Sequence, residues 1–294
     1  MRRLGSVNAR ALGFGLLVVL LSACYGSSVA PPTGDAPLRY RDAIFPNVTV
    51  TKDLTYGQSL DLSNNVVDLK LDLYQPTGDT ATSRPAVVWV HGGGFSGGDK
   101  GDDGYLVTPL VHEGYVGVSI NYRLLAPGGC TGGGTLSDTC VTAAAAGIND
   151  GRTAVRWLRA NAATYGIDPT RIAVEGFSAG GIIATGVGLT SDQPANGSNP
   201  TVSSRVGAWL SVSGGLPGGE FADATDSPGY LFSGTADPTV PYQWSKDTAD
   251  VLDKAGVFVV LNTEQGVGHQ LPDLNVLATQ ATNFFYKELD LAHA

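Results

Sequence analysis

The sequence predicts an α/β protein with one doubly wound, mostly parallel sheet that begins with antiparallel strands. Three observations carry this prediction. Continuous apolar runs of strand length recur along the chain, as in strands buried on both faces of a parallel sheet. Segments with helical patterning fall between these runs, which is typical of a doubly wound sheet. An earlier segment alternates polar and apolar residues, which predicts an antiparallel start.

The strands are expected at seven places. Residues 68–74 alternate with a period of two, so they predict a half-exposed antiparallel strand. The later strands are continuous apolar runs, expected at Ala86–Val90, Tyr115–Ile120, Arg171–Glu175, Ala208–Val212, Tyr230–Phe232 and Phe258–Leu261.

Helices are expected in the gaps between the strands. A stripe of Val155, Leu158 and Ala162 predicts one of them, and the polar turn 99–104 precedes another. The five expected helices are Tyr105–Glu113, Asp150–Ala163, Ala179–Leu189, Trp244–Lys254 and Asn275–Leu289. No internal repeat is visible, and one domain over residues 41–294 accounts for the pattern.

The N-terminus has the pattern of an export signal. Arginines at positions 2, 3 and 10 precede a short apolar run, and residues 1–23 are interpreted as a signal peptide. The run ends at Leu-Ser-Ala-Cys24, which resembles the lipobox of bacterial lipoproteins, in which the cysteine is lipidated. Ordinary cleavage beside an incidental cysteine is the alternative. Residues 24–40 are predicted to form a flexible tether. The protein is thus expected at the cell surface or in the periplasm as a lipoprotein, or otherwise secreted, with membrane contact only through the anchor.

Charge and cysteine content restrict the function classes. The net charge is −9, without a Lys/Arg-rich stretch, so a nucleic-acid partner has little electrostatic support. Cys130 and Cys140 are expected in one Gly-rich loop and predict a structural disulfide in an exported protein. No metal-ligand spacing or dinucleotide motif occurs, so neither a metal nor another cofactor is expected.

A nucleophile is indicated by the pattern Gly-x-Ser-x-Gly, which occurs twice, around Ser96 and around Ser178. The chemistry requires a strand, a sharp turn and a helix, which together expose the serine at the carboxyl edge of the sheet. Ser178 follows an apolar strand and precedes a helical segment, whereas the residues after Ser96 are too rich in glycine for a helix. Ser178 is therefore the predicted nucleophile, and Ser96 is expected in a loop.

A serine hydroxyl needs a base, and the chain has four histidines. His293 is at the C-terminus, His112 falls in an expected helix, and His91 closes a strand. His269 lies in a loop between the last strand and the last helix, so it is the predicted base.

The acid is expected between the serine and the histidine in the chain. Asp237 follows the strand at 230–232, on the carboxyl side of the sheet, where a carboxylate can orient the imidazole. Asp223 and Asp226 are alternatives that precede this strand. A purely structural turn before Pro238 is the other interpretation of Asp237.

Acyl transfer also requires donors for the oxyanion. The segment His91-Gly-Gly-Gly-Phe95 follows a predicted strand and supplies backbone N–H groups near the serine. The N–H of Ala179 supplies another. A plain Gly-rich turn is the alternative for this segment.

Together these motifs resemble the esterases of the hormone-sensitive-lipase and acetyl-esterase type, which have the α/β-hydrolase fold. The resemblance rests on five segments in the family's order: His91-Gly-Gly-Gly-Phe, Asn121-Tyr-Arg-Leu, Gly176-Phe-Ser-Ala-Gly-Gly, Asp237-Pro-Thr-Val-Pro and Gly268-His269. It implies an oxyanion hole of Gly93, Gly94 and Ala179, with His91 supporting the loop.

The chain also departs from that family. Residues 215–229 are too few for the helical cap that many relatives carry, so no large cap domain is expected. An open cleft would favour short-acyl esters or esters displayed on a polymer, and the resemblance implies a serine carboxylesterase that acts on them through an acyl-enzyme. Two alternatives remain: a serine peptidase or amidase of the prolyl-oligopeptidase type, and a non-catalytic surface binding protein on a hydrolase scaffold.

Overall fold

The computed structural model describes residues 25–130, 136–190, 199–217, 222–270 and 272–294. Its centre is one eight-stranded sheet with the strand order β1-β2-β4-β3-β5-β6-β7-β8. The strands are β1 (Val48–Leu60), β2 (Val66–Pro76), β3 (Arg84–Val90), β4 (Val116–Ile120), β5 (Ile167–Phe177), β6 (Ala208–Val212), β7 (Gly229–Gly234) and β8 (Val259–Glu264).

The pairing of these strands confirms the predicted mostly parallel sheet with an antiparallel start, and β1 is an eighth strand beyond the seven expected. β2 pairs antiparallel with both β1 and β4, and all later neighbours pair in parallel from β4 to β8. Every residue of β3 and β6 is buried, as expected for continuous apolar runs. The alternating strand β2 buries its second half, from Leu71 to Tyr74, where it lies between β1 and β4.

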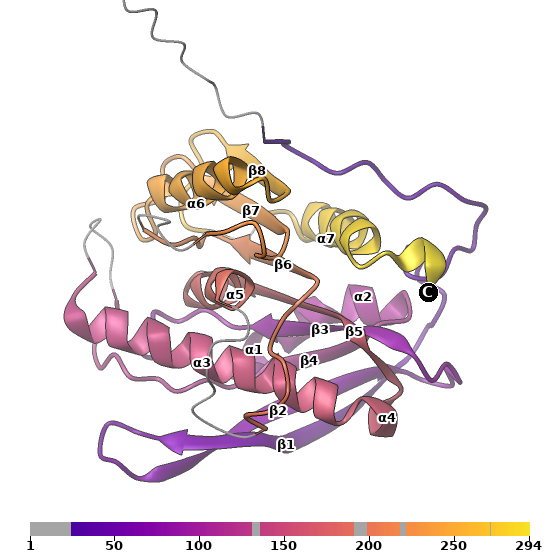
Figure 1. Cartoon of the computed structure of the whole chain (residues 1–294), viewed down its shortest axis with the longest axis horizontal. Coiled ribbons are helices and arrows are strands. Elements are labelled where there is room, and N and C mark those ends of the chain that lie inside the picture. The colour runs from indigo at the N-terminus through magenta and orange to yellow at the C-terminus, as the bar shows by residue number, and fades with distance from the viewer. Residues whose placement is uncertain (1–24, 131–135, 191–198, 218–221, 271) are drawn as a thin grey trace, which may run out of the picture.

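Helices cover both faces of the sheet (Figure 1). Helices α3, α4, α5 and α6 pack on one face, and α2 and α7 pack on the other. Their bounds are α1 (Lys100–Asp103), α2 (Thr108–His112), α3 (Asp138–Ala160), α4 (Ala162–Tyr165), α5 (Ala179–Leu189), α6 (Tyr242–Ala255) and α7 (Leu274–Glu288), with 3-10 turns at Gly104–Val107 and Leu291–His293. Alternate residues of β3 therefore enter different cores. Val88 and Val90 pack on the face covered by α3 to α6, and Trp89 packs on the face covered by α2 and α7.

Two helical segments differ from the expectation. Helix α3 begins at Asp138, not at 150, because Ser137 caps its first turn and an alanine-rich run continues it. The expected polar turn at 99–104 is a short helix, α1, with Asp99 as its N-cap in a capping box. Lys100 in this helix is buried, and its ammonium pairs with Asp53 and Asp72.

The expected tether is packed on the domain in the part that the structure describes. Gly26 forms a parallel bridge with Val260 of β8, and the carbonyl of Val29 accepts a hydrogen bond from Asn283 of α7. Val29 is buried, and Figure 1 shows the segment running past α7. Residues 25–40 are thus not a free linker, because the buried side chains of Val29 and Tyr40 and the edge of β8 hold them against the domain. The predicted signal peptide and Cys24 lie outside the described residues. Among the residues that the structure describes, no helix combines the length and the hydropathy of a membrane span.

Candidate active site

Ser178 occupies the turn between β5 and α5. Phe177 ends the strand, Ala179 begins the helix, and Ser178 has φ 56° and ψ −120°. A positive φ is strained for a non-glycine residue, and such strain collects at functional sites. A Cβ on Gly180 would lie 2.0 Å from the carbonyl oxygen of Val90, so only glycine permits this close packing of turn and strand.

The three residues predicted as a triad lie in one hydrogen-bonded chain. The hydroxyl of Ser178 lies 2.8 Å from Nε2 of His269, and Nδ1 of His269 lies 2.7 Å from Oδ2 of Asp237. With Nδ1–H donating to the carboxylate, Nε2 is free to accept the serine proton. The Asp237 side chain is fully buried, which strengthens its interaction with the imidazole.

Asp237 combines both interpretations given to it. Its Oδ1 accepts hydrogen bonds from the backbone N–H groups of Thr239 and Val240, which is the expected turn, while Oδ2 accepts from His269. The alternative residues Asp223 and Asp226 instead bond within their own turn. Geometry therefore selects Asp237 as the partner of the imidazole.

The loop that carries His269 packs against the end of β7. The backbone N–H of Ala236 donates to the carbonyl of Val267, and a Cβ on Gly234 would lie 2.3 Å from that same oxygen. The imidazole lies 5.2 Å from the ring of Phe177, measured between centroids. These contacts hold His269 beside the serine turn.

The glycine-rich segment after β3 lies next to the serine. A Cβ on Gly92 would lie 3.3 Å from the Cβ of Ser178, and Gly93 and Gly94 have φ of 108° and 60°. The carbonyl of Gly93 accepts hydrogen bonds from the N–H groups of residues 96 and 97, which closes a tight turn and places Ser96 in it, as expected. Glycine is required here because L-residues rarely adopt such φ values.

His91 is part of the support of this segment. It is buried, its Nδ1–H donates to the carbonyl of Gly92, and its ring stacks on Tyr122 with 4.5 Å between centroids. Burial lowers the pKa of His91, which keeps the imidazole neutral at pH 7. A neutral ring held in this way suits a structural role better than acid–base work.

Tyr122 and Arg123 make contacts that the sequence does not predict. The Tyr122 hydroxyl donates to the carbonyls of His91 and Gly92, at 3.2 and 3.1 Å. The guanidinium of Arg123 pairs with the buried carboxylate of Asp150 in α3. Both belong to the segment Asn121-Tyr-Arg-Leu, so the motif was visible but its partners, distant in the chain, were not.

The predicted disulfide between Cys130 and Cys140 is formed in the structure. Cys140 lies in the first turn of α3, not in a loop as expected, because Ser137 starts the helix before it. The backbone N–H of Cys130 donates to the carbonyl of Gly94. The disulfide thereby connects the glycine-rich segment to α3. Within the described parts of the chain, no three His, Cys, Asp or Glu side chains form a group that could hold a metal ion.

Comparison with known proteins identifies the architecture. The BD-FAE family model matches residues 71–208. The esterase Est2 of the Planctomycetes species Thermogutta terrifontis, solved with propionate bound, superposes with a TM-score of 0.65 at 25% identity, covering 87% of this chain and 98% of that one. The chain has the α/β-hydrolase fold. A truncated carbohydrate esterase from gut microbiota shares it, with a TM-score of 0.63 at 21% identity, covering 82% of this chain and 96% of that one.

Curated relatives of this chain match over shorter stretches. Phenmedipham hydrolase of Pseudarthrobacter oxydans is 39% identical over 113 residues, which are 38% of this chain and 21% of that protein. Secreted lipase 5 of Gibberella zeae is 31% identical over 167 residues, 51% of this chain and 30% of the lipase. The chain thus spans less than a third of the length of these relatives. Asp237 and His269 lie outside the residues matched by the family model, so their placement rests on the geometry.

Proposed function

We propose that this protein is a serine carboxylesterase, with Ser178 as nucleophile, His269 as general base and Asp237 as the orienting acid. The hydrogen-bonded chain from Ser178 through His269 to Asp237, at a strand–turn–helix elbow, is the observation that carries the proposal. Esterases and a lipase among its relatives support the same class of reaction.

The reaction proceeds by two acyl transfers. The Ser178 oxygen attacks the ester carbonyl while its proton passes to Nε2 of His269, and a tetrahedral intermediate forms. His269 then gives the proton to the departing alkoxide, which leaves as the alcohol and yields an acyl-enzyme. Water attacks this ester with His269 again as base, and the carboxylic acid and free serine result. Asp237 stays ionised throughout and stabilises the imidazolium.

Backbone N–H groups of Gly93, Gly94 and Ala179 form the proposed oxyanion hole. Ala179 is the first residue of α5, so its N–H is one of those that lack a partner within the helix. The glycine-rich segment lies against Ser178, and Tyr122 and His91 hold its backbone in place. Fixed donors at the developing charge lower the barrier without reorganisation during the reaction.

Short-acyl esters or esters displayed on a polymer are the proposed substrates. Between β6 and β7, the described residues of the segment 213–228 contain no helix or strand that would form a cap over the serine. Est2 has been solved with propionate and with butyrate, which are short acids, and another structural relative is a carbohydrate esterase. No nucleic-acid partner or cofactor is part of this proposal.

Export is proposed together with this activity. A disulfide between Cys130 and Cys140 persists in oxidising compartments and rarely in the cytosol. Lipidation at Cys24 would anchor the protein to a membrane, and secretion is the alternative. Labelling of cells with radioactive palmitate distinguishes them: a labelled wild-type protein and an unlabelled Cys24→Ala variant support the anchor, and an unlabelled wild-type protein contradicts it.

The activity is tested with p-nitrophenyl esters of increasing acyl length. We expect hydrolysis that declines from acetate and butyrate towards octanoate, and its loss in Ser178→Ala. Ser96→Ala is the matched control, because Ser96 occupies the second Gly-x-Ser-x-Gly pattern but lies in a turn. Equal activity in the wild type and Ser178→Ala would refute the nucleophile. A preference for long acyl chains would refute the proposed substrate class.

A further inference from the structure

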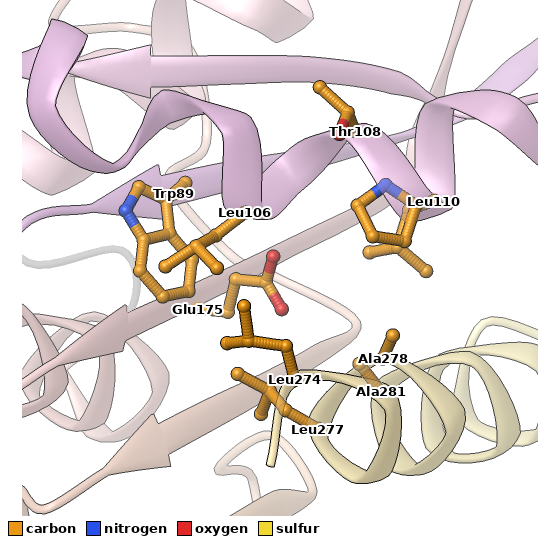
Figure 2. Close-up of a pocket in the computed structure, with 10 residues that line it drawn as sticks. Trp89, Leu106, Thr108, Leu110, Glu175, Leu274, Leu277, Ala278 and Ala281 are labelled. Carbon is orange, nitrogen blue, oxygen red and sulfur yellow. The ribbon is translucent and has the colours of Figure 1, made fainter. Parts of the chain in front are cut away.

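A cavity of about 160 Å³ lies on the face of the sheet that α2 and α7 cover (Figure 2). Eight of its ten lining residues are apolar, and the two polar ones are Glu175 from β5 and Thr108 from α2. The apolar ones are Trp89, Leu106, Pro109, Leu110, Leu274, Leu277, Ala278 and Ala281. An apolar cavity of about this volume in another protein holds benzene, so a compact organic molecule fits.

Glu175 is the unusual group in this wall. Its side chain is only 2% exposed, and Figure 2 shows its carboxylate pointing into the space between α2 and α7. No described residue donates a hydrogen bond to it, and burial raises the pKa of Glu175 to about 8. A buried carboxylate without a donor or a countercharge is costly. A positively charged ligand with N–H groups would supply both the hydrogen-bond donor and the countercharge that the Glu175 carboxylate lacks.

Trp89 places an indole ring beside Glu175 in the wall of the cavity. It pairs with Glu175 in the parallel register of β3 and β5, so both side chains lie on the same face as neighbours. A cation is attracted to the face of an indole ring. A carboxylate beside an indole, surrounded by leucine and alanine side chains, matches a ligand with an ammonium head and a hydrocarbon body.

We propose that this cavity is a binding site for a small organic ammonium ion. Its N–H groups donate to the carboxylate of Glu175, and its hydrocarbon part packs between Leu110 of α2 and Leu277 and Ala281 of α7. The partly exposed Leu106 and exposed Leu274 lie at the surface end of the cavity. Because the triad does not use Glu175, the site is independent of the proposed ester hydrolysis.

Binding of the cation is linked to the proton on Glu175. The ligand requires the carboxylate, so below the pKa its affinity falls by about tenfold for each pH unit. Glu175 is the one titratable residue among the described residues of the wall. On the same face its charge acts on Tyr115, on which Glu113, Tyr40 and Tyr286 also act. Burial raises the pKa of Tyr115 far above the range between pH 6 and 8, so Tyr115 keeps its proton. The pKa of Glu113 is raised to about 8, like that of Glu175, so the pH dependence that belongs to Glu175 is the part that persists in Glu113→Gln.

The test is calorimetric titration of the full chain with n-butylammonium chloride at pH 8.5. We expect a single site, with n-butanol bound at least about tenfold more weakly because it lacks the charge. Glu175→Gln is expected to lose the preference for the cation. Glu113→Gln is the matched control, since Glu113 is also a buried carboxyl but bonds to Thr282 and does not line the cavity. Ala278→Phe keeps the carboxylate in the chain but fills the cavity, and it is expected to abolish binding.

Three results would overturn the proposal. The first is no binding to a folded wild-type protein, and the second is equal binding of n-butanol and n-butylammonium. The third is binding that survives in both Glu175→Gln and Ala278→Phe, which would place the cation elsewhere. If Glu175→Gln does not fold, Ala278→Phe and the comparison of the two probes still decide the question.

Discussion

Asp237 takes part both in the fold and in the proposed chemistry. One carboxylate oxygen accepts two backbone N–H groups of the turn that follows β7, and the other accepts the Nδ1–H of His269. The turn thereby fixes the carboxylate, so the proposed reaction needs no reorganisation of Asp237 when the imidazolium forms. Both interactions depend on a carboxylate at this position.

Asp237→Asn is therefore expected to keep the fold and to lose most of the activity. The amide can donate a hydrogen bond to Nδ1, which selects the tautomer whose Nε2 carries a proton and cannot accept one from Ser178. We expect kcat to fall by about 10⁴-fold, measured with p-nitrophenyl acetate. Asp223→Asn, which alters a carboxylate in another turn, should retain full activity. A loss of less than about tenfold in Asp237→Asn would contradict the assigned role.

We infer that Tyr122 positions the glycine-rich segment 91–95 of the proposed oxyanion hole. Tyr122→Phe removes the hydroxyl that donates to the carbonyls of His91 and Gly92 but keeps the ring stacked on His91. We expect kcat to fall by about tenfold with little change in KM, since the loop acts on the transition state. Tyr230→Phe, whose hydroxyl bonds to Gln280 of α7, is the control. Equal kcat in the wild type and Tyr122→Phe would contradict a positioning role for the Tyr122 hydroxyl.

At the scale of elements, the elbow between β5 and α5 depends on glycine at close approach. A Cβ on Gly176 would lie 2.5 Å from the carbonyl of Gly180, and one on Gly180 would lie 2.0 Å from the oxygen of Val90. Both contacts are with backbone, which cannot move aside as a flexible side chain does. The sheet, the helix and the serine turn are thus packed without room for a methyl group.

Gly180→Ala is expected to destabilise the protein by more than about 3 kcal/mol, since overpacking that can relax already costs about 1–3 kcal/mol. Urea unfolding monitored by circular dichroism measures this change. Gly97→Ala is the matched control, because a Cβ there meets no atom within 4 Å and its φ is not positive. If both variants unfold at the same urea concentration as the wild type, the close backbone contact at Gly180 does not require glycine.

Most elements were predictable because each has a local pattern. The runs at 86–90 and 208–212 are buried on both faces, so their continuous apolar character reports their position in the sheet. The start of α3 was not predictable, because its first turns carry alanine and glycine instead of an apolar stripe. The three residues of the proposed triad followed from motif and chain order. The partners of Tyr122 and Arg123 come from distant segments, and no local pattern records them.

At the scale of the whole molecule, the two faces of the sheet have different roles. The serine turn leads into α5, which packs on one face with α3, while the other face, under α2 and α7, contains two buried carboxyls, Glu113 and Glu175. Burial raises the pKa of each to about 8. Both groups are therefore protonated in the folded protein at pH 7 and ionised in the unfolded chain.

This difference predicts that stability falls as the pH rises from 6.5 to 8. A carboxyl with a raised pKa in the folded state stabilises fully below its unfolded pKa, and this stabilisation is lost as the pH rises through the folded pKa. The window begins at 6.5 because His91, whose pKa burial lowers, has the opposite dependence at lower pH.

Urea unfolding across this range measures the slope. Glu113→Gln and Glu175→Gln should each flatten it, whereas Glu264→Gln, at the partly exposed end of β8, should not. A stability that is constant or rises from pH 6.5 to 8 in the wild type would contradict the protonated state of the two buried carboxyls.

The most direct test of the proposed enzyme is covalent labelling of its nucleophile. The protein is incubated with a fluorophosphonate, which phosphonylates activated serines with loss of fluoride, and the adduct is located by intact mass and peptide mapping. We predict one adduct per chain, on Ser178, that forms equally in Ser96→Ala and is absent from Ser178→Ala. A folded protein that gains no adduct, or gains it on another residue, would contradict the claim that Ser178, His269 and Asp237 form a working triad.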